Sequence, residues 1–318
     1  MNTMKWLVKR EFWEHKGGFF WAPVVVGAIM TFFLAITLLA GVVMGTKHGF
    51  HVNGEDMHDL SGVMTAEQKA QFAHGLATGY MGVATPLIMV LGFMVFFYCL
   101  SALYDERKDR SVLFWKSLPI SDQETVLSKL VMALGLAPLI TLVAATITSV
   151  LSMFFICIAA AVMGVNLFVP VLSSSATYLA PFQMAATIPV YILWALPSVG
   201  WLMMVSAWSR TKPFLWAVGV PVLTGALISW FNAIFDYGWN VSWFWKHIVG
   251  RGLLSVAPGS WFGFNDSLQN SIHSEPKMSD LVAISWQSLA TADLWIGAVL
   301  GAGMIYVAMR LRRYRDEG

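Results

Sequence analysis

Histidine and aspartate side chains gather in one polar stretch near the start of the chain, where they could hold a metal ion. His48, His51 and His58 lie close together, with Asp56 and Asp59 among them. Imidazole and carboxylate groups are common ligands of copper and zinc. Their spacing here is irregular and matches no regular metal-ligand pattern. We therefore expect a solvated polar loop with no resident metal, and we keep His48, His51 and His58 as the alternative metal ligands.

The residue pattern does not support nucleotide binding, cysteine chemistry or catalysis inside the membrane. A P-loop needs a Gly-Lys pair, which this chain lacks, so any ATP would have to bind to another chain. The only two cysteines, Cys99 and Cys157, lie inside apolar runs and are expected to be small core residues. The apolar runs also lack the paired polar residues that intramembrane catalysis needs. We predict no catalytic residue and no cofactor on this chain, which is then not an enzyme.

The most distinctive polar segment is residues 104–130, the 104–130 loop. It opens with six consecutive charged residues, 105–110, and continues with an amphiphilic stretch that ends at Pro119. Ser121 and Glu124 then have the spacing of a capping box, in which each side chain pairs with the other residue's backbone amide. The pattern predicts a short helix, a proline turn and a capped second helix that enters the next apolar run.

This loop has two possible uses. Its apolar residues Leu113, Phe114 and Leu118 could enter a groove on a partner protein, with the flanking charges setting the register. The alternative is a solvated loop whose positive charges only set the membrane orientation. The residue pattern alone leaves both open.

The elements around this loop are membrane helices. The chain has 318 residues, of which 57% are hydrophobic and 12% charged, whereas soluble domains have about a quarter charged residues. A helix needs about 20 apolar residues to cross the hydrocarbon core. The runs are continuously apolar and do not alternate, which favours helices over barrel strands. Six segments qualify: 21–45, 81–103, 131–160, 183–208, 214–235 and 293–309.

The basic residues predict how these spans are oriented. Fifteen of the 20 Lys and Arg residues fall on one side if both chain ends lie on that side. Because basic residues favour the cytoplasmic face, we expect cytoplasmic N and C termini in the inner membrane of a bacterium. The remaining five are Lys47, Lys69, Lys246, Arg251 and Lys277.

The segments outside the spans complete a single domain over residues 1–318. Residues 1–18 are expected to form an interfacial helix, although Glu11 interrupts its apolar stripe. Residues 46–80 and 236–292 are the outer segments. Within the second, 243–264 is apolar but broken by glycine and proline, which indicates a re-entrant or interfacial hairpin before the sixth span.

Apart from Asp293, the first residue of the sixth, the six cores contain no Asp, Glu, Lys, Arg or His. Transporters coupled to protons or sodium generally need ionisable groups at membrane depth, although carbonyl oxygens at broken helices can also bind sodium. This absence argues against a self-sufficient secondary transporter.

The 104–130 loop resembles the hallmark of type-2 ABC permeases. The resemblance rests on Glu106-Arg107-Lys108, on Leu113, on the run from Ser117 to Ser121, and on Glu124 and the run from Leu127 to Leu130. The sequence has Asp109-Arg110-Ser111 where many relatives have a glycine. The motif covers 27 residues, and the six-span layout extends the similarity over the chain.

The resemblance implies a permease subunit of an ATP-driven exporter for an amphipathic, lipid-like or peptide-like substrate. It implies two copies of a separate ATPase subunit that bind ATP and Mg²⁺, a second permease subunit that makes a homodimer or a heterodimer, contact with membrane lipid, and no nucleic acid. The alternative is a non-transporting membrane adaptor or mechanotransmitter driven by a partner ATPase. The residues expected to couple the loop to the ATPase are Glu106, Arg107, Lys108, Leu113, Phe114, Leu118, Pro119, Ser121, Glu124 and Lys129.

Overall fold

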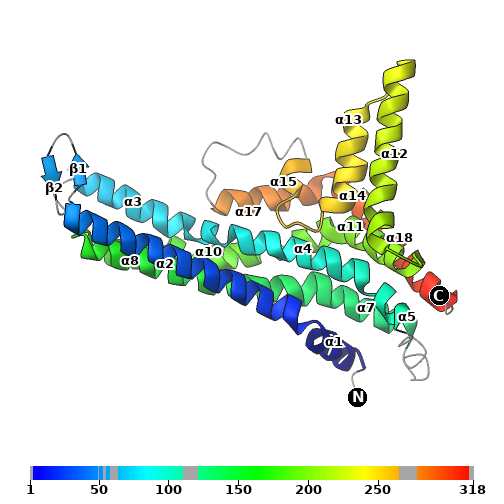
Figure 1. Ribbon diagram of the computed structural model, residues 1–318, viewed down its shortest axis with the longest axis horizontal. Helices are drawn as coiled ribbons and strands as arrows, with labels where there is room; N and C mark the ends of the chain where they lie inside the picture. The colour runs from blue at the N-terminus through cyan, green and yellow to red at the C-terminus, as the bar shows by residue number, and fades with distance from the viewer. Residues whose placement is uncertain are drawn as a thin grey trace.

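The protein is a bundle of long α-helices in the computed structural model, which describes residues 3–48, 50–52, 55–57, 64–109, 121–264 and 278–314 (Figure 1). In these residues six helical segments are long and apolar enough to cross a membrane. This confirms the predicted all-α polytopic membrane protein, and every predicted span lies within one of the six segments. They are Gly17–Gly45, Ala66–Lys108, Asp122–Val162, Ser175–Trp208, Pro213–Phe235 and Ala292–Tyr314.

The chain begins with helix α1, Thr3–Glu14, in the region predicted to form an interfacial helix. A π-helical turn, η1 (Gly17–Trp21), separates it from α2, Ala22–His48, which contains the first span. In η1 the first turn contains Gly17 and Gly18, which have the lowest helix propensity after proline. The weak turn lets α1 leave the direction of α2 (Figure 1).

Residues 46–80, which we expected to form a polar loop, contain regular secondary structure. A short antiparallel hairpin of β1 (Phe50–Val52) and β2 (Glu55–Met57) pairs Phe50 with Met57 in register. Helix α3, Ala66–Gly79, follows, and its start has a capping box between Thr65 and Gln68. A 3₁₀ turn, η2 (Tyr80–Ala84), then joins α3 to α4, Thr85–Ser101. The second span is therefore the continuation of a helical segment that begins at Ala66.

The second and third spans are connected through the 104–130 loop, of which the structure describes the two ends. Helix α5, Tyr104–Lys108, begins it, and α7, Asp122–Val131, ends it. The π-helical turn η3 (Met132–Leu136) connects α7 to α8, Ala137–Val162. Helices α2, α4 and α8 run side by side along the long axis of the molecule (Figure 1).

The fourth span is the buried centre of the bundle. Helices α9 (Phe168–Ser173) and α10 (Ser175–Ala185) precede α11, Ile188–Trp208, which packs along α18, Ala292–Tyr314. The two helices approach closely at Gly200 and Gly301. A Cβ atom added to Gly200 would fall on the carbonyl of Gly301, and one added to Gly301 would fall on the carbonyl of Leu196.

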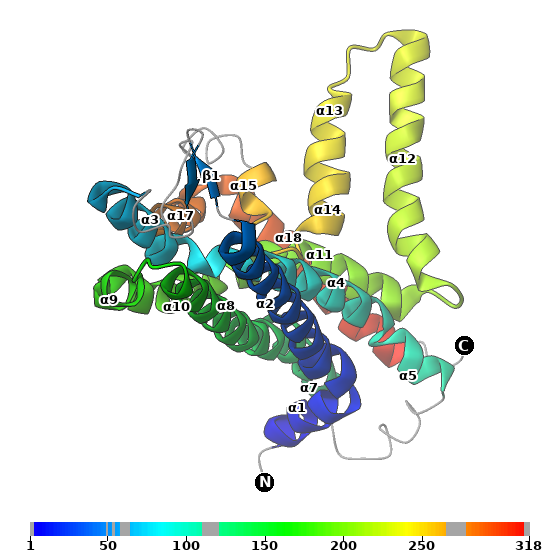
Figure 2. The same cartoon turned by 60° about the vertical axis from the view of Figure 1, so that its left-hand side comes forward.

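Helix α12, Pro213–Phe235, contains the fifth span and stands apart from the other long helices (Figure 2). Lys212 before it and Asp236 after it have left-handed backbone conformations, with φ of 48° and 47°. A right-handed helix cannot continue through such residues, which explains both ends.

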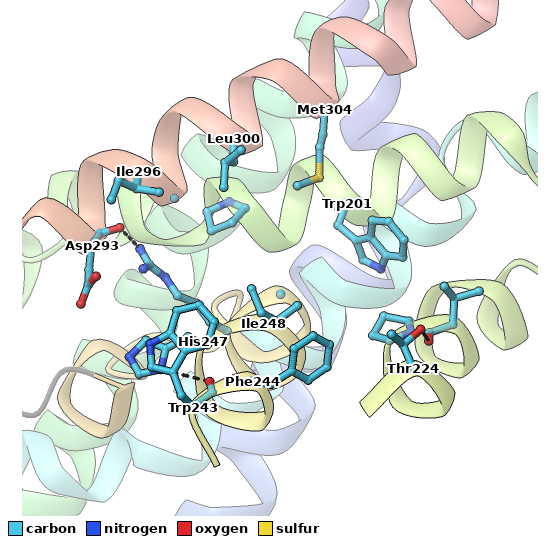
Figure 3. Close-up of a pocket in the computed structure, with 16 residues that line it drawn as sticks. Trp201, Thr224, Trp243, Phe244, His247, Ile248, Asp293, Ile296, Leu300 and Met304 are labelled. Atoms are coloured by element: carbon cyan, nitrogen blue, oxygen red, sulfur yellow. Dashed lines mark hydrogen bonds between the residues drawn. The ribbon is translucent and has the colours of Figure 1, made fainter. Parts of the chain in front are cut away.

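The predicted hairpin before the sixth span is helical. After the turn at Asp236 the chain returns beside α12 through α13 (Val241–Phe244), η4 (Trp245–Gly250) and α14 (Arg251–Leu254). Helices α15 (Trp261–Phe264) and α17 (Met278–Gln287) and the turn η5 (Ser288–Ala290) lead into α18. A cavity of about 540 Å³ lies between this hairpin, α11 and α18 (Figure 3).

Candidate functional site

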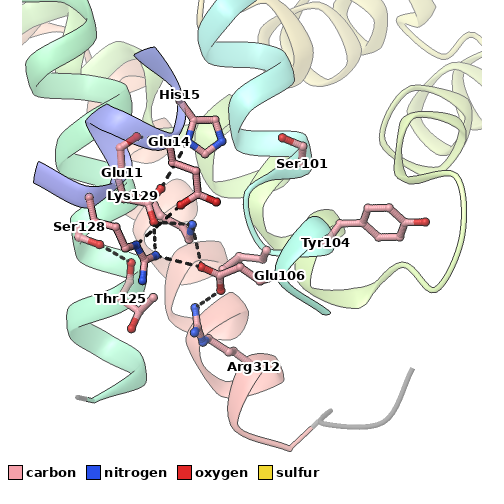
Figure 4. A network of polar contacts seen from close by, with 12 residues as sticks. Glu11, Glu14, His15, Ser101, Tyr104, Glu106, Thr125, Ser128, Lys129 and Arg312 are labelled. Atoms are coloured by element: carbon pink, nitrogen blue, oxygen red, sulfur yellow. Dashed lines mark hydrogen bonds and ion pairs between the residues drawn. The ribbon is translucent and has the colours of Figure 1, made fainter. Parts of the chain in front are cut away.

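The described ends of the 104–130 loop meet a cluster of buried charges, which we call the ionic cluster. Its members come from four helices that are far apart in the sequence (Figure 4). Helix α1 contributes two residues, and α5, α7 and α18 contribute one each. The side chains are between 0% and 15% exposed. They are Arg10, Glu11, Glu106, Lys129 and Arg312.

Lys129 lies at the centre of the ionic cluster. Its Nζ is 2.9 Å from Oε1 of Glu11 and 3.0 Å from Oε1 of Glu106. The other carboxylate oxygen of Glu106 lies 2.9 Å from Nη1 of Arg312. On the opposite side, Nη2 of Arg10 lies 2.6 Å from Oε1 of Glu11. The loop ends are thereby tied to both the first and the last helix of the chain.

The cluster is electrically balanced. Asp122, at the start of α7, adds a third carboxylate, 3.2 Å from Nε of Arg312, so three buried or half-buried acidic groups face three cations. A fourth carboxylate, the exposed Glu14, lies at the edge, 3.8 Å from Nε of Arg10. The hydroxyl of Tyr98 donates a hydrogen bond of 3.0 Å to Oε2 of Glu11. Buried ions are tolerated when they are paired and their remaining hydrogen-bonding groups are satisfied. This balance allows the charges to lie inside the protein.

Pairing with the neighbouring cations has a strong effect on the pKa of Glu11. Burial alone would raise the pKa of this carboxyl. The charges and hydrogen bonds of Lys129 and Arg10 outweigh burial and lower the pKa to about 2. Glu11 therefore stays ionised through the physiological pH range.

Five of the ten predicted coupling residues occupy defined positions around this junction. Glu106 and Lys129 form the ion pair described above. Arg107 donates from Nη2 to the carbonyl oxygens of Ser206 and Ser209, at 2.5 and 2.9 Å, and so ties α5 to the end of α11. The predicted capping box is confirmed, because Glu124 and Ser121 each accept a hydrogen bond of 3.1 Å from the other's backbone amide.

The other five predicted coupling residues are less informative. Lys108 is exposed at the end of α5. The remaining four lie outside the described residues: Leu113, Phe114, Leu118 and Pro119.

Sequence reasoning missed the partners of the loop. Glu11 was noticed only because it interrupts an apolar stripe, and Arg10 and Arg312 were counted only as positive charges near the chain ends. A carboxylate on an otherwise apolar helix face is a usable signal, since such a group is buried only when it is paired. Which cation pairs with it depends on packing between helices far apart in the chain.

The described residues offer one group with metal-ligand geometry, formed by Glu11, Glu14 and His15. The Glu11 oxygens already accept from Lys129, Arg10 and Tyr98, so a metal would have to displace these partners. We assign no metal there. The histidines predicted as alternative ligands are not tested: the side chains of His48 and His51, and all of His58, lie outside the described residues.

The fold and the site define a class of protein: an all-α, multi-pass membrane protein with a buried ionic junction at one end of its bundle. Comparisons with protein-family models, with curated proteins and with solved structures find no match for this chain.

Proposed function

We propose that this chain is the membrane-spanning permease subunit of an ATP-driven ABC exporter, with ATP and Mg²⁺ bound on two copies of a separate ATPase subunit. A second permease subunit, identical or different, completes the complex. The apolar, aromatic membrane interior suits an amphipathic, lipid-like or peptide-like substrate. The proposal starts from the motif of the 104–130 loop.

The observation that supports this role best is the ion pair between the two ends of the loop. Glu106 belongs to α5, which leaves the second span, and Lys129 belongs to α7, which enters the third. Their side chains lie 3.0 Å apart with little exposure. A partner that pushes on the loop between them would act on both spans together.

The same junction would distribute that force further. Glu11 joins α1 to it, Arg312 joins α18, and Arg107 holds the end of α11. Rigid helices joined by a packed, charged contact move as a unit more readily than helices joined by mobile loops. In this proposal the ionic cluster converts docking of an ATPase on the loop into movement of the bundle.

The cluster also fits the proposed orientation. It gathers α1, both loop ends and α18 at one end of the bundle, where the basic residues concentrate. With the basic residues on the cytoplasmic face, both termini and the loop would face an ATPase in the cytoplasm of a bacterium.

The test is to purify the tagged chain from its native membrane in mild detergent, identify what accompanies it by mass spectrometry, and assay vanadate-sensitive ATPase activity. A stoichiometric ATPase is expected. The double variant Leu118→Asp, Pro119→Ala should lose it, because the docking surface is changed. Glu106→Gln should keep the ATPase bound but uncouple its activity from transport. Asp105→Asn makes the same acid-to-amide change at the exposed residue next to Glu106; it is the matched control and should behave as wild type.

Two results would overturn the proposal. Recovery of the folded chain without any ATPase would contradict the family assignment. An ATPase that binds, but whose cycle moves no solute or lipid across vesicles while capturing an outer partner, would establish the adaptor role in place of export.

A further inference from the structure

The cavity beside α12 contains a buried cation that is influenced by the charge of Asp293 but forms no ion pair with it. Arg251, the first residue of α14, is 7% exposed and lines the cavity together with residues of α11, α12 and α18. Within the described residues, no carboxylate oxygen lies at ion-pair distance from it. Its Nη2 donates to the backbone carbonyl of Asp293, and its Nε is buried without a hydrogen-bond partner.

Packing contacts and hydrogen bonds hold Arg251 in its position. Its guanidinium carbon lies 4.3 Å from the centroid of the Trp194 ring, and a Cβ atom at Gly297 would collide with the guanidinium. The backbone carbonyl of Arg251 accepts hydrogen bonds from Ser198 (2.9 Å) and Ser255 (2.6 Å). A buried cation held this firmly, with a donor unused, is costly unless an anion approaches it.

The rest of the cavity is apolar and elongated. On α18 its lining residues Asp293, Ile296, Leu300 and Met304 recur every three or four positions and so form one face of the helix (Figure 3). From Asp293 to Met304 this face extends about 16 Å along the helix axis, roughly half the ~30 Å of the hydrocarbon core. The cavity therefore runs through about one leaflet, with its charge at one end.

The cavity also opens to the surroundings of the bundle. Ile296 and Leu300 are each 57% exposed, and Ile248 on the opposite wall is 46% exposed. In a membrane these side chains face lipid, so a chain could enter sideways from the bilayer. A volume of about 540 Å³ falls in the range of about 300–1,000 Å³ that is usual for small-molecule sites.

We propose that this cavity binds one anionic lipid, with an acyl chain along the α18 face and the phosphate or carboxylate headgroup at the Arg251 guanidinium. The anion supplies the acceptor that the buried Nε lacks. His247, whose ring stacks on Trp243 at 5.2 Å, borders the same cavity and adds a hydrogen-bonding group. Asp293 also lines the cavity, and its negative charge disfavours dianionic headgroups, so the site selects lipids with a single charge.

This inference goes beyond the proposed function and needs no ATPase. The test uses the full chain, purified and delipidated in an uncharged detergent, and native mass spectrometry of bound lipid. Three probes are compared: phosphatidylglycerol, phosphatidylcholine with the same chains, and glycerophosphoglycerol, which has the same singly charged phosphodiester without acyl chains. One phosphatidylglycerol should be retained, at least about tenfold more tightly than phosphatidylcholine. The reason is that the anionic headgroup forms a charge-assisted hydrogen bond with the Arg251 guanidinium.

Two pairs of variants locate the site. Arg251→Gln should reduce phosphatidylglycerol retention to the level of phosphatidylcholine, whereas Arg310→Gln, which removes an exposed cation elsewhere, should not. Gly252→Leu should block retention by filling the cavity, because Gly252 borders it and a Cβ there meets no atom within 4 Å. Gly219→Leu is its control, since that glycine of α12 also has open space but does not line the cavity.

Several outcomes would overturn the inference. Equal retention of the two lipids by the wild type would show that charge is not recognised. Glycerophosphoglycerol binding as tightly as the lipid would show a site for a free anion. If Arg251→Gln does not fold, Gly252→Leu decides: undiminished retention in that variant would place the lipid elsewhere. None of these outcomes bears on the proposed permease function, which is tested separately by whether an ATPase accompanies the chain.

Discussion

Lys129 and Glu11 lie 118 positions apart in the chain, yet their side chains meet at 2.9 Å inside the protein. This pair joins the N-terminal helix α1 to the helix that enters the third span. Because Lys129 also contacts Glu106, a single ammonium group joins the chain's first helix to both ends of the 104–130 loop.

Removing the central cation should destabilise the protein strongly. In Lys129→Met the side chain keeps its bulk, but Glu11 and Glu106 lose their shared partner. Breaking one member of a buried ion pair costs about 3–5 kcal/mol. We expect a clear fall in the thermal unfolding temperature in detergent. Lys108→Met, which changes an exposed lysine of the same loop, should leave that temperature nearly unchanged; equal effects of the two substitutions would contradict the cluster's role.

The stabilising effect of Glu11 should depend on pH. Its pKa is about 2 in the folded protein and 4.5 when unperturbed. The carboxylate therefore stabilises the fold fully above about pH 4.5, and this contribution is lost as the pH falls towards 2. The shift corresponds to about 3 kcal/mol. The measurement compares the unfolding free energies of wild type and Glu11→Gln across this range. Their difference should shrink as the pH falls, and a difference independent of pH would refute the assignment.

The close contact between α11 and α18 should tolerate no side chain. In Gly301→Leu the new Cβ would overlap the backbone of Leu196, so the helices must separate. Overpacking of a close contact costs about 1–3 kcal/mol, and more where the obstacle is backbone. Gly303→Leu, two residues further along α18, adds the same side chain in open space and should be tolerated. Unfolding temperature and expression level of the two variants provide the comparison.

The proposed orientation predicts which residues react from each side of the membrane. Lys108→Cys, at the exposed end of α5, should be labelled by a membrane-impermeant maleimide only from the cytoplasmic side. Gln71→Cys, on the exposed face of α3, should be labelled only from outside. The native Cys99 and Cys157 are buried and should contribute little background. The opposite labelling pattern would invert the topology and separate the loop from any cytoplasmic ATPase.

Much of the fold could be predicted from local pattern. Each of the six spans was expected from a continuous apolar run, because such a run can satisfy its backbone in lipid only as a helix. The capping box at Ser121 and Glu124 was also expected, since both partners lie within one turn of the chain. The helical α3 was not expected, because its residues are polar and their order depends on packing against neighbouring helices.

The site was predicted only in part. Glu106 and Lys129 were selected from a motif, but nothing in that motif indicated that they touch each other, Glu11 and Arg312. Arg251 was counted as an ordinary outer basic residue, although it is buried beside Trp194. In both places the outcome depends on which helices lie beside each other, and a linear pattern has no information on that.

The sequence by itself determined the membrane class, the number of spans and the local helix start at Ser121, because hydrophobic length and capping act over a few neighbouring residues. The tertiary structure alone decided which charges are buried together and where a cavity remains. Burial of Lys129 is favourable only where Glu11 and Glu106 converge on it. Arg251 is buried because α14 packs against α11 and its guanidinium lies against Asp293 and Gly297 of α18. Such pairings arise from contacts between distant segments, and these form only when the helices pack.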